Sequence, residues 1–187
     1  MITPHTPAPS PDTRPALVAG AHAPFLALLP ARGHLLEAGC GAGEDLRLFR
    51  ERGLMVTAFD ASRAQAAAAS RLCGQPVRIC RFEQMRSVVP YDGIWASGSL
   101  PCLPEHEIAP ALGHLATLLK AGGPLYASFP HGKGEPLPRS GEYPLQTRLD
   151  EAGLLRLVTP LPVTLHRHWC SEDGANGRWL HALLLRC

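Results

Sequence analysis

The sequence predicts an α/β protein with a Rossmann-like, doubly wound and mainly parallel sheet that ends in a C-terminal antiparallel hairpin. The first observation is that five short apolar runs alternate with helix-forming segments between His34 and Phe129. The second is that the first run turns directly into the glycine-rich "GCGAG", Gly39–Gly43. The third is a pair of apolar runs around the turn-like "SEDGANG" near the C-terminus. Alternating strands and helices favour a parallel sheet with right-handed crossovers, and paired runs around a turn are typical of a hairpin.

The N-terminal residues 1–14 are rich in proline, and this composition predicts a disordered tail. Residues 15–187 are expected to form a single domain with one hydrophobic core. Its first segment, Pro15–Pro30, predicts a short amphipathic helix. Because proline lacks a backbone donor, we expect this helix to be interrupted or to end around Pro24.

The central segment supplies the parallel part of the predicted sheet. Its compact apolar runs predict five strands, at His34–Gly39, Leu54–Asp60, Pro76–Cys80, Tyr91–Ser97 and Leu125–Phe129. The intervening segments predict helices at Glu44–Gly53, Ser62–Gly74 and Glu105–Lys120. Ser62 is a typical N-cap and Gly74 a typical terminator. The third helix has one apolar face, formed by Ile108, Leu112, Leu115 and Leu119.

The pattern changes after Phe129. Pro130–Pro144 is rich in glycine and proline and has no periodicity, which predicts a loop. A short helix is expected over Leu145–Gly153. The runs Leu154–Trp169 and Gly177–Cys187 are expected to be the two strands of the terminal hairpin.

The composition excludes several classes of protein. Hydrophobic residues at 45% and charged residues at 18% are globular values, and no run is long enough to span a membrane. The net charge of +2 comes without a basic block, so no nucleic-acid partner is expected. The start of the chain does not have the pattern of a secretory signal. The six cysteines show neither disulfide-like nor zinc-like spacing, which favours a reduced, cytoplasmic protein.

The glycine turn has the wrong spacing for a dinucleotide. In the GxGxxG fingerprint, the third glycine would fall at Glu44 or Leu46. The second predicted strand ends on Asp60, roughly twenty residues beyond the turn, where a carboxylate can accept hydrogen bonds from ribose hydroxyls. The site therefore suits a nucleoside ligand without a pyrophosphate.

Four stretches in this order resemble successive motifs of class I S-adenosylmethionine-dependent methyltransferases. They are "LLEAGCGAG", "VTAFDAS", "YDGIWASGSL" and "LKAGGPLYASF". The resemblance runs from about Leu26 to Phe129. Within the family, the chain looks most similar to small bacterial enzymes grouped with tellurite-resistance and general small-molecule methyltransferases. The resemblance implies S-adenosylmethionine as cofactor and a small-molecule methyl acceptor.

The resemblance also implies roles for individual residues. The methionine and ribose part of the cofactor would be lined by Gly39, Cys40, Gly41 and Gly43, in a loop oriented by Glu37. Asp60 would hold the ribose hydroxyls, with Ala61 and Ser62 beside the adenosine. Phe82 or Glu83 would flank the adenine, and Ala96 and Ser97 would face the methionine end. The residues alone leave two alternatives open: Asp60 as a helix cap and Phe82 as a core residue.

The chain departs from the family pattern at Cys102, where many small-molecule members carry a histidine. The "PC" pair of Pro101 and Cys102 imitates the nucleophile of cytosine-C5 methyltransferases, but the chain has no room for their base-recognition domain. We expect Cys102 to shape the pocket as an ordinary thiol. No catalytic residue is assigned, and the pocket candidates are Ser97, Cys102 and His131. His166 and His168 imitate a metal pair without a third ligand, so no metal is expected.

The predicted function is methyl transfer from S-adenosylmethionine to a small molecule by in-line displacement. A sulfonium methyl group is already activated, so a base is needed only for an acceptor that is protonated at working pH. The alternative is a catalytically reduced family member that binds the cofactor and acts as a binding or partner protein. A nucleic-acid methyltransferase is disfavoured by the modest charge. The sequence sets no expectation for the acceptor atom or the oligomeric state.

Overall fold

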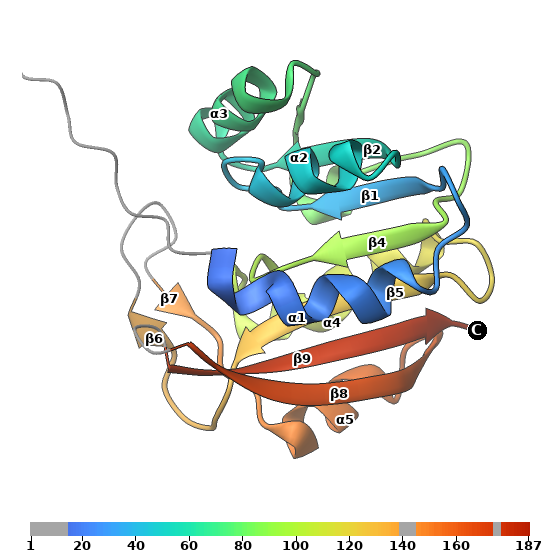
Figure 1. The fold of residues 1–187 in the computed structure, drawn as a ribbon. Helices are drawn as coiled ribbons and strands as arrows, with labels where there is room; N and C mark the ends of the chain where they lie inside the picture. The colour runs from blue at the N-terminus through green and yellow to red at the C-terminus, as the bar shows by residue number, and fades with distance from the viewer. Residues whose placement is uncertain (1–14, 139–144, 174–176) are drawn as a thin grey trace, which may run out of the picture.

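The computed structural model describes residues 15–138, 145–173 and 177–187 (Figure 1). The predicted disordered tail at residues 1–14 lies outside the described residues, as do residues 139–144 of the predicted loop and 174–176 of the predicted turn. A seven-stranded sheet, in the order β3-β2-β1-β4-β5-β9-β8, forms the centre of the fold. Its strands are β1 His34–Ala38, β2 Met55–Asp60, β3 Arg78–Ile79, β4 Gly93–Ala96, β5 Pro124–Pro130, β8 Val163–Asp173 and β9 Gly177–Arg186.

The sheet is parallel from β3 to β5 and antiparallel beyond it. The β1–β2 register runs from His34 opposite Met55 to Ala38 opposite Phe59. Strand β9 pairs with β5, and β8 pairs with β9 to close that edge. The predicted parallel sheet with a C-terminal antiparallel hairpin is therefore confirmed.

Helices cover both faces of the sheet (Figure 1). They are α1 Pro15–Leu26, α2 Glu44–Glu51, α3 Arg63–Cys73, α4 Glu105–Thr117 and α5 Glu151–Val158. Helices α1, α2 and α3 pack on one face, where Phe25 and Phe49 surround Trp95. Helices α4 and α5 pack on the other face, through side chains such as Leu112 and Leu154. This is the doubly wound arrangement that the sequence predicts.

Helix α1 corrects the expectation for Pro24, because the helix continues through this residue to Leu26. A proline near the last turn removes only one backbone hydrogen bond. Ala21 and Phe25, four residues apart on the helix, are buried between it and the sheet. Their burial holds this part of the helix on the sheet despite the missing bond.

The segment after the predicted loop differs from the prediction. Leu145–Gln146 is a short strand, β7, that pairs with β6 at Leu137–Pro138 instead of beginning a helix. The helix begins only after Asp150, whose carboxylate accepts from the Gly153 N–H at 2.8 Å. The residues that we read as the start of a strand, Leu154–Val158, are therefore helical. Strand β8 begins later, at Val163.

The predicted third strand is reduced to two exposed residues at the edge of the sheet, Arg78 and Ile79. Two 3-10 turns follow strands at the carboxyl edge of the sheet, η1 at Phe82–Gln84 and η2 at Leu100–Cys102. In the part of the chain that the structure describes, no helix has both the length and the apolar character that crossing a membrane requires. The ends of β1, β2, β4 and β5 meet at the same edge of the sheet, and they position the candidate site.

Candidate functional site

The glycine turn after β1 needs glycine for two physical reasons. Gly39, Gly41 and Gly43 have φ angles of 74°, 55° and 92°, a region that other residues rarely adopt. A Cβ on Gly39 would lie 2.4 Å from the Cβ of Ser99, and one on Gly43 would lie 2.8 Å from the Cβ of Ala69. Close approach to protein atoms, rather than only to a ligand, therefore selects glycine at both positions.

Asp60 ties this turn to the end of β2. Its Oδ2 accepts from the Gly41 N–H and its Oδ1 accepts from the Ser62 N–H, each at 2.8 Å. The side-chain cap of α3 is Ser62, which accepts from the Gln65 N–H at 3.3 Å. Asp60 is thus a buried acid that organises the loop, rather than the helix cap of the alternative interpretation. An ionised carboxylate has about four acceptor positions, so two remain for a ligand.

Glu37 and Cys40 are buried on either side of the first glycine. Burial, followed by the nearby Glu37 and Asp60 carboxylates, holds the pKa of the Cys40 thiol far above its usual range. The Cys40 Sγ faces the Gly41 carbonyl at 3.6 Å. Cys40 is therefore a neutral thiol in the wall of the turn and not a nucleophile.

The end of β4 is joined to its neighbours through short polar contacts. Ser99 Oγ donates to the Ala38 carbonyl at 2.6 Å, and the Gly98 N–H donates to Ser128 Oγ at 2.9 Å. Ala96 is buried, and Ser97 is half-buried beside it. These contacts hold the loop after β4 against the ends of β1 and β5.

The remaining cofactor-site residues lie around the β2 and β3 ends. Ala61 is exposed after Asp60, and Glu83 is exposed on η1. Phe82 is buried and packs edge-to-face on Phe59, with ring centroids 5.4 Å apart. The structure thus brings together the glycine turn, Asp60, η1 and the end of β4, while Phe82 has the contacts of a core residue.

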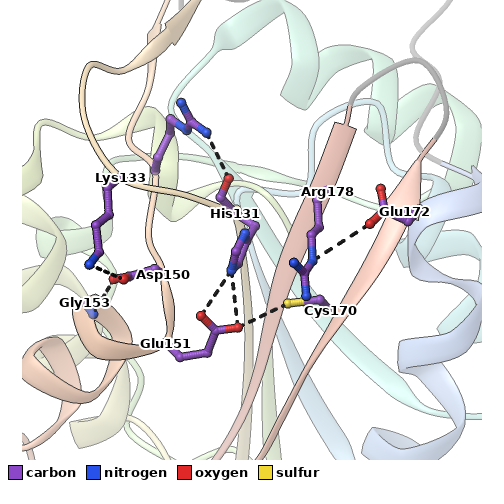
Figure 2. Close-up of polar contacts among 9 residues, drawn as sticks. His131, Lys133, Asp150, Glu151, Gly153, Cys170, Glu172 and Arg178 are labelled. Carbon is purple, nitrogen blue, oxygen red and sulfur yellow. Dashed lines mark hydrogen bonds and ion pairs between the residues drawn. The ribbon is translucent and has the colours of Figure 1, made fainter.

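The other two pocket candidates lie on η2 and directly after β5. Cys102 lies on η2, where its Sγ contacts the Gly98 carbonyl at 3.6 Å. Cys102 also lines a large cavity. His131 follows β5, and its Nε2 lies 3.1 Å from Glu151 Oε2. Figure 2 shows His131 directed toward Glu151, with the Cys170 sulfur beside the same carboxylate. His166 and His168 are exposed on β8.

A cavity of about 870 Å³ begins at Cys102 and extends between the start of α4, the segment after β5 and the start of α5. Its wall includes Lys133, Arg148 and Arg156, together with the acids Glu105 and Asp150. Lys133 pairs with Asp150 at 3.1 Å. The Arg148 Nη2 donates to the His131 carbonyl at 3.2 Å, while its buried Nε has no hydrogen-bond partner among the described residues.

Sequence reasoning missed Arg148 and Trp179. Trp179, on β9, lies against Gly98, where an added Cβ would be 3.5 Å from the indole ring. Its Nε1 is buried and has no hydrogen-bond partner within the described ranges. Neither residue belongs to a local motif, so only the pairing of β9 with β5 reveals that Trp179 lies beside the end of β4.

Residues 36–125 match a family model described as a methyltransferase domain. No curated protein sequence matches the chain. Three solved structures with the same fold illustrate its range. The Burkholderia thailandensis 1,6-didemethyltoxoflavin-N1-methyltransferase, bound to 1,6-didemethyltoxoflavin and S-adenosylhomocysteine, has a TM-score of 0.78 and 22% identity, over 93% of this chain and 80% of that one.

The magnesium protoporphyrin IX methyltransferase of Synechocystis PCC 6803, with bound SAM, has a TM-score of 0.72 and 19% identity, over 91% of this chain and 78% of that one. The [4+2]-cyclase SpnF has a TM-score of 0.69 and 18% identity, over 84% of this chain and 76% of that one. At these identities the solved structures show a shared fold. Residues 36–125 are therefore similar to a methyltransferase domain, and the fold is the one that these S-adenosylmethionine-dependent methyltransferases share.

Proposed function

We propose that this protein transfers the methyl group of S-adenosylmethionine to a small-molecule acceptor by in-line displacement. The observation that carries the proposal is the glycine turn held by Asp60 at the carboxyl edge, close to the Gly98–Cys102 segment that leads into the 870 Å³ cavity. Small-ligand pockets are typically about 300–1,000 Å³. The cavity therefore has the size of a pocket for a small acceptor. The tellurite-resistance-like grouping stays a prediction.

The residues present fit the cofactor. A buried carboxylate with free acceptor positions lies where ribose hydroxyls would bind, and the glycine turn leads into α2 without a side-chain cap on its first N–H groups. In the proposal, Asp60 accepts from the ribose hydroxyls and Gly39–Gly43 surrounds the methionine part. Phe82 or Glu83 borders the adenine, Ala61 and Ser62 lie beside the adenosine, and Ala96 and Ser97 face the methyl end.

The cofactor, when bound, supplies an activated methyl group. The protein then has to place the acceptor atom in line and keep water away, since positioning dominates such a displacement. The Gly98–Cys102 segment and Trp179 form the border between the cofactor edge and the rest of the site. The helix that follows Cys102 carries Glu105 and Glu107 in its first turn, and these carboxylates oppose a thiolate. This arrangement favours Cys102 as a wall of the pocket rather than a covalent nucleophile.

The charges of the cavity favour an acceptor that carries an anionic group. Lys133 is neutralised by Asp150, whereas the buried Arg148 Nε faces no acceptor among the described residues. A buried polar group without a partner is costly, and a ligand carboxylate or phosphate would supply one. Arg148→Gln should then raise the KM for an anionic acceptor by about tenfold, without changing affinity for S-adenosylhomocysteine.

A second candidate function is cofactor binding without methyl transfer. The [4+2]-cyclase among the similar structures has this fold but is named for another reaction. The test is a methyl-transfer assay over paired acceptors, each carboxylic acid beside its amide, with calorimetry on the cofactor. Methylation of acids over amides supports the proposal. Tight binding of S-adenosylmethionine without turnover on any acceptor would favour the binding role.

A further inference from the structure

A second cluster of reactive side chains lies outside the proposed methyl-transfer site. His131 follows β5, Glu151 is the first residue of α5, and Cys170 lies on β8 (Figure 2). His131 Nε2 is 3.2 and 3.1 Å from the two Glu151 carboxylate oxygens, and Cys170 Sγ is 3.6 Å from Glu151 Oε1. One donor atom from each residue lies within 4.8 Å of the other two.

These distances suit a single ion at the centre of the cluster. Zinc bonds to nitrogen, oxygen and sulfur are about 2.0–2.3 Å long, so two ligands of a tetrahedral ion lie roughly 3.2–3.7 Å apart. Glu151 Oε1 lies 3.2 Å from His131 Nε2 and 3.6 Å from Cys170 Sγ, and both separations match this spacing. The imidazole and the thiol lie within 4.8 Å of each other, and a side-chain rotation can bring them to the same spacing.

The main chain holds all three ligands in place. The His131 N–H donates to the Arg178 carbonyl at 2.8 Å, and its own carbonyl accepts from Arg148. Glu151 is fixed at the start of α5, and Cys170 is fixed by the pairing of β8 with β9. A ligand set that is positioned before the metal arrives loses little freedom when it binds.

The surrounding charges are compatible with a divalent cation. Arg178 is a cation near Cys170, and its Nε lies 3.9 Å from Glu172 Oε1, so the Glu172 carboxylate offsets part of its charge (Figure 2). The Glu151 carboxylate and a Cys170 thiolate together balance two positive charges. Because the Glu151 side chain is 45% exposed, a water molecule has access to a fourth position.

We propose that His131, Glu151 and Cys170 bind one zinc ion, with water as the fourth ligand. Binding replaces the proton of the Cys170 thiol by the metal, and that proton leaves to solvent. The ion would join the segment after β5, the start of α5 and the terminal hairpin. Gly132 and Lys133, directly after His131, line the cavity, so the same ion would also fix one cavity wall. This proposal does not depend on methyl transfer.

The test is metal titration of the full chain after dialysis against a chelator. Co²⁺ should bind at one equivalent and produce a thiolate-to-cobalt absorption band in the near ultraviolet, and Zn²⁺ should abolish that band by displacement. Cys170→Ser should remove the band and weaken Zn²⁺ binding by at least about tenfold. Cys80→Ser, which removes a half-buried thiol elsewhere, is the matched control and should change neither.

Glu151→Gln provides an independent variant if Cys170→Ser folds poorly. It should keep the thiolate band but weaken Zn²⁺ by about tenfold or more in competition with a chromophoric chelator. The same Zn²⁺ affinity in the wild type and in both variants would overturn the proposal. Cobalt binding without a thiolate band in the wild type would overturn it as well.

Discussion

Cys102 lies between the end of β4 and the cavity, and its Sγ contacts the Gly98 carbonyl at 3.6 Å. A nucleophilic thiol needs a lowered pKa, from a cation or from a helix N-terminus. The first turn of the helix that follows carries Glu105 and Glu107, which oppose a thiolate. The chemistry at this position is therefore that of a small side chain in a pocket wall.

We predict that Cys102→Ser keeps cofactor affinity and retains measurable turnover. The hydroxyl is close in size to the thiol and can donate to the same carbonyl. Intact-mass spectrometry with acceptor present should find no adduct on the wild-type protein. A trapped covalent species, or a loss of turnover beyond about 10³-fold with binding intact, would show that Cys102 is the nucleophile.

His181 gives the folded protein a defined response to acid. Its Nδ1 lies 2.7 Å from Tyr126 Oη, and its Nε2 lies 2.7 Å from Ser171 Oγ. Burial lowers the pKa of His181 from 6.5 to about 4. Below the unfolded pKa the unfolded chain takes up a proton that the folded chain does not. This contribution to stability is therefore complete above about pH 6.5 and is lost as the pH falls toward about 4.

Urea unfolding of the wild type and of His181→Gln measures this effect. Glutamine does not titrate, so the wild type should lose about 2–3 kcal/mol more than the variant between about pH 7 and pH 4.5. The difference between the two proteins removes the common contribution of the other titrating groups. Equal losses in both proteins would show that His181 is protonated in the folded state.

At the scale of residues, the sequence predicted the residues of the proposed cofactor site better than those around the cavity. The glycines and Asp60 follow a strand directly, and strand ends of a parallel sheet meet at one edge, so their proximity follows from the fold. His131, Glu151 and Cys170 are far apart in sequence, and no local pattern joins them. Arg148 likewise lies in a segment whose secondary structure was wrongly predicted.

At the scale of elements, the segment after Asp150 shows where the pattern of apolar residues did not predict the secondary structure. The run from Leu154 to Trp169 is apolar throughout, which does not distinguish a buried helix from a strand. Leu154 and Val158 are buried four residues apart, and Asp150 caps the helix that contains them. The cap was the decisive local signal, and its position fixes both the start of α5 and the wall of the cavity.

The segment after β5 is expected to respond to ligands. Residues 133–136 are exposed, and Lys133, Gly134 and Pro136 line the cavity. We predict fast amide exchange there in the free protein, and slower exchange with cofactor and acceptor bound. The prediction covers Pro130–Glu142, although residues 139–142 lie outside the described part of the chain. The turn Lys120–Gly123, before β5, is the control and should not respond.

Hydrogen exchange followed by mass spectrometry measures both segments in one experiment. If the amides of the segment after β5 are protected equally in the free protein and in the complex, this segment does not cover the acceptor. The fold and the cofactor site would be unaffected by that result. A response of the control turn would instead point to global stabilisation.

At the scale of the molecule, the architecture was predictable because each level of the sequence points the same way. Short apolar strands, capped helices and a glycine turn at the first strand end define a doubly wound sheet before any side-chain contact is considered. The cavity was not predictable, because its walls come from segments between Cys102 and Leu157 that only the folded chain brings together.

Calorimetric titration with S-adenosylhomocysteine tests the central claim most directly, comparing the wild type with Asp60→Ala and Asp92→Ala. Asp92 is the matched control, because it also accepts from a backbone N–H, that of His34, at 2.7 Å. It pairs with Lys120, away from the glycine turn. Loss of two hydrogen bonds to an ionised acceptor should weaken binding to Asp60→Ala by roughly 2–4 kcal/mol, about 30- to 1000-fold. Asp92→Ala should bind like the wild type. No binding to the wild type, or a change of less than about threefold in Asp60→Ala, would contradict the account.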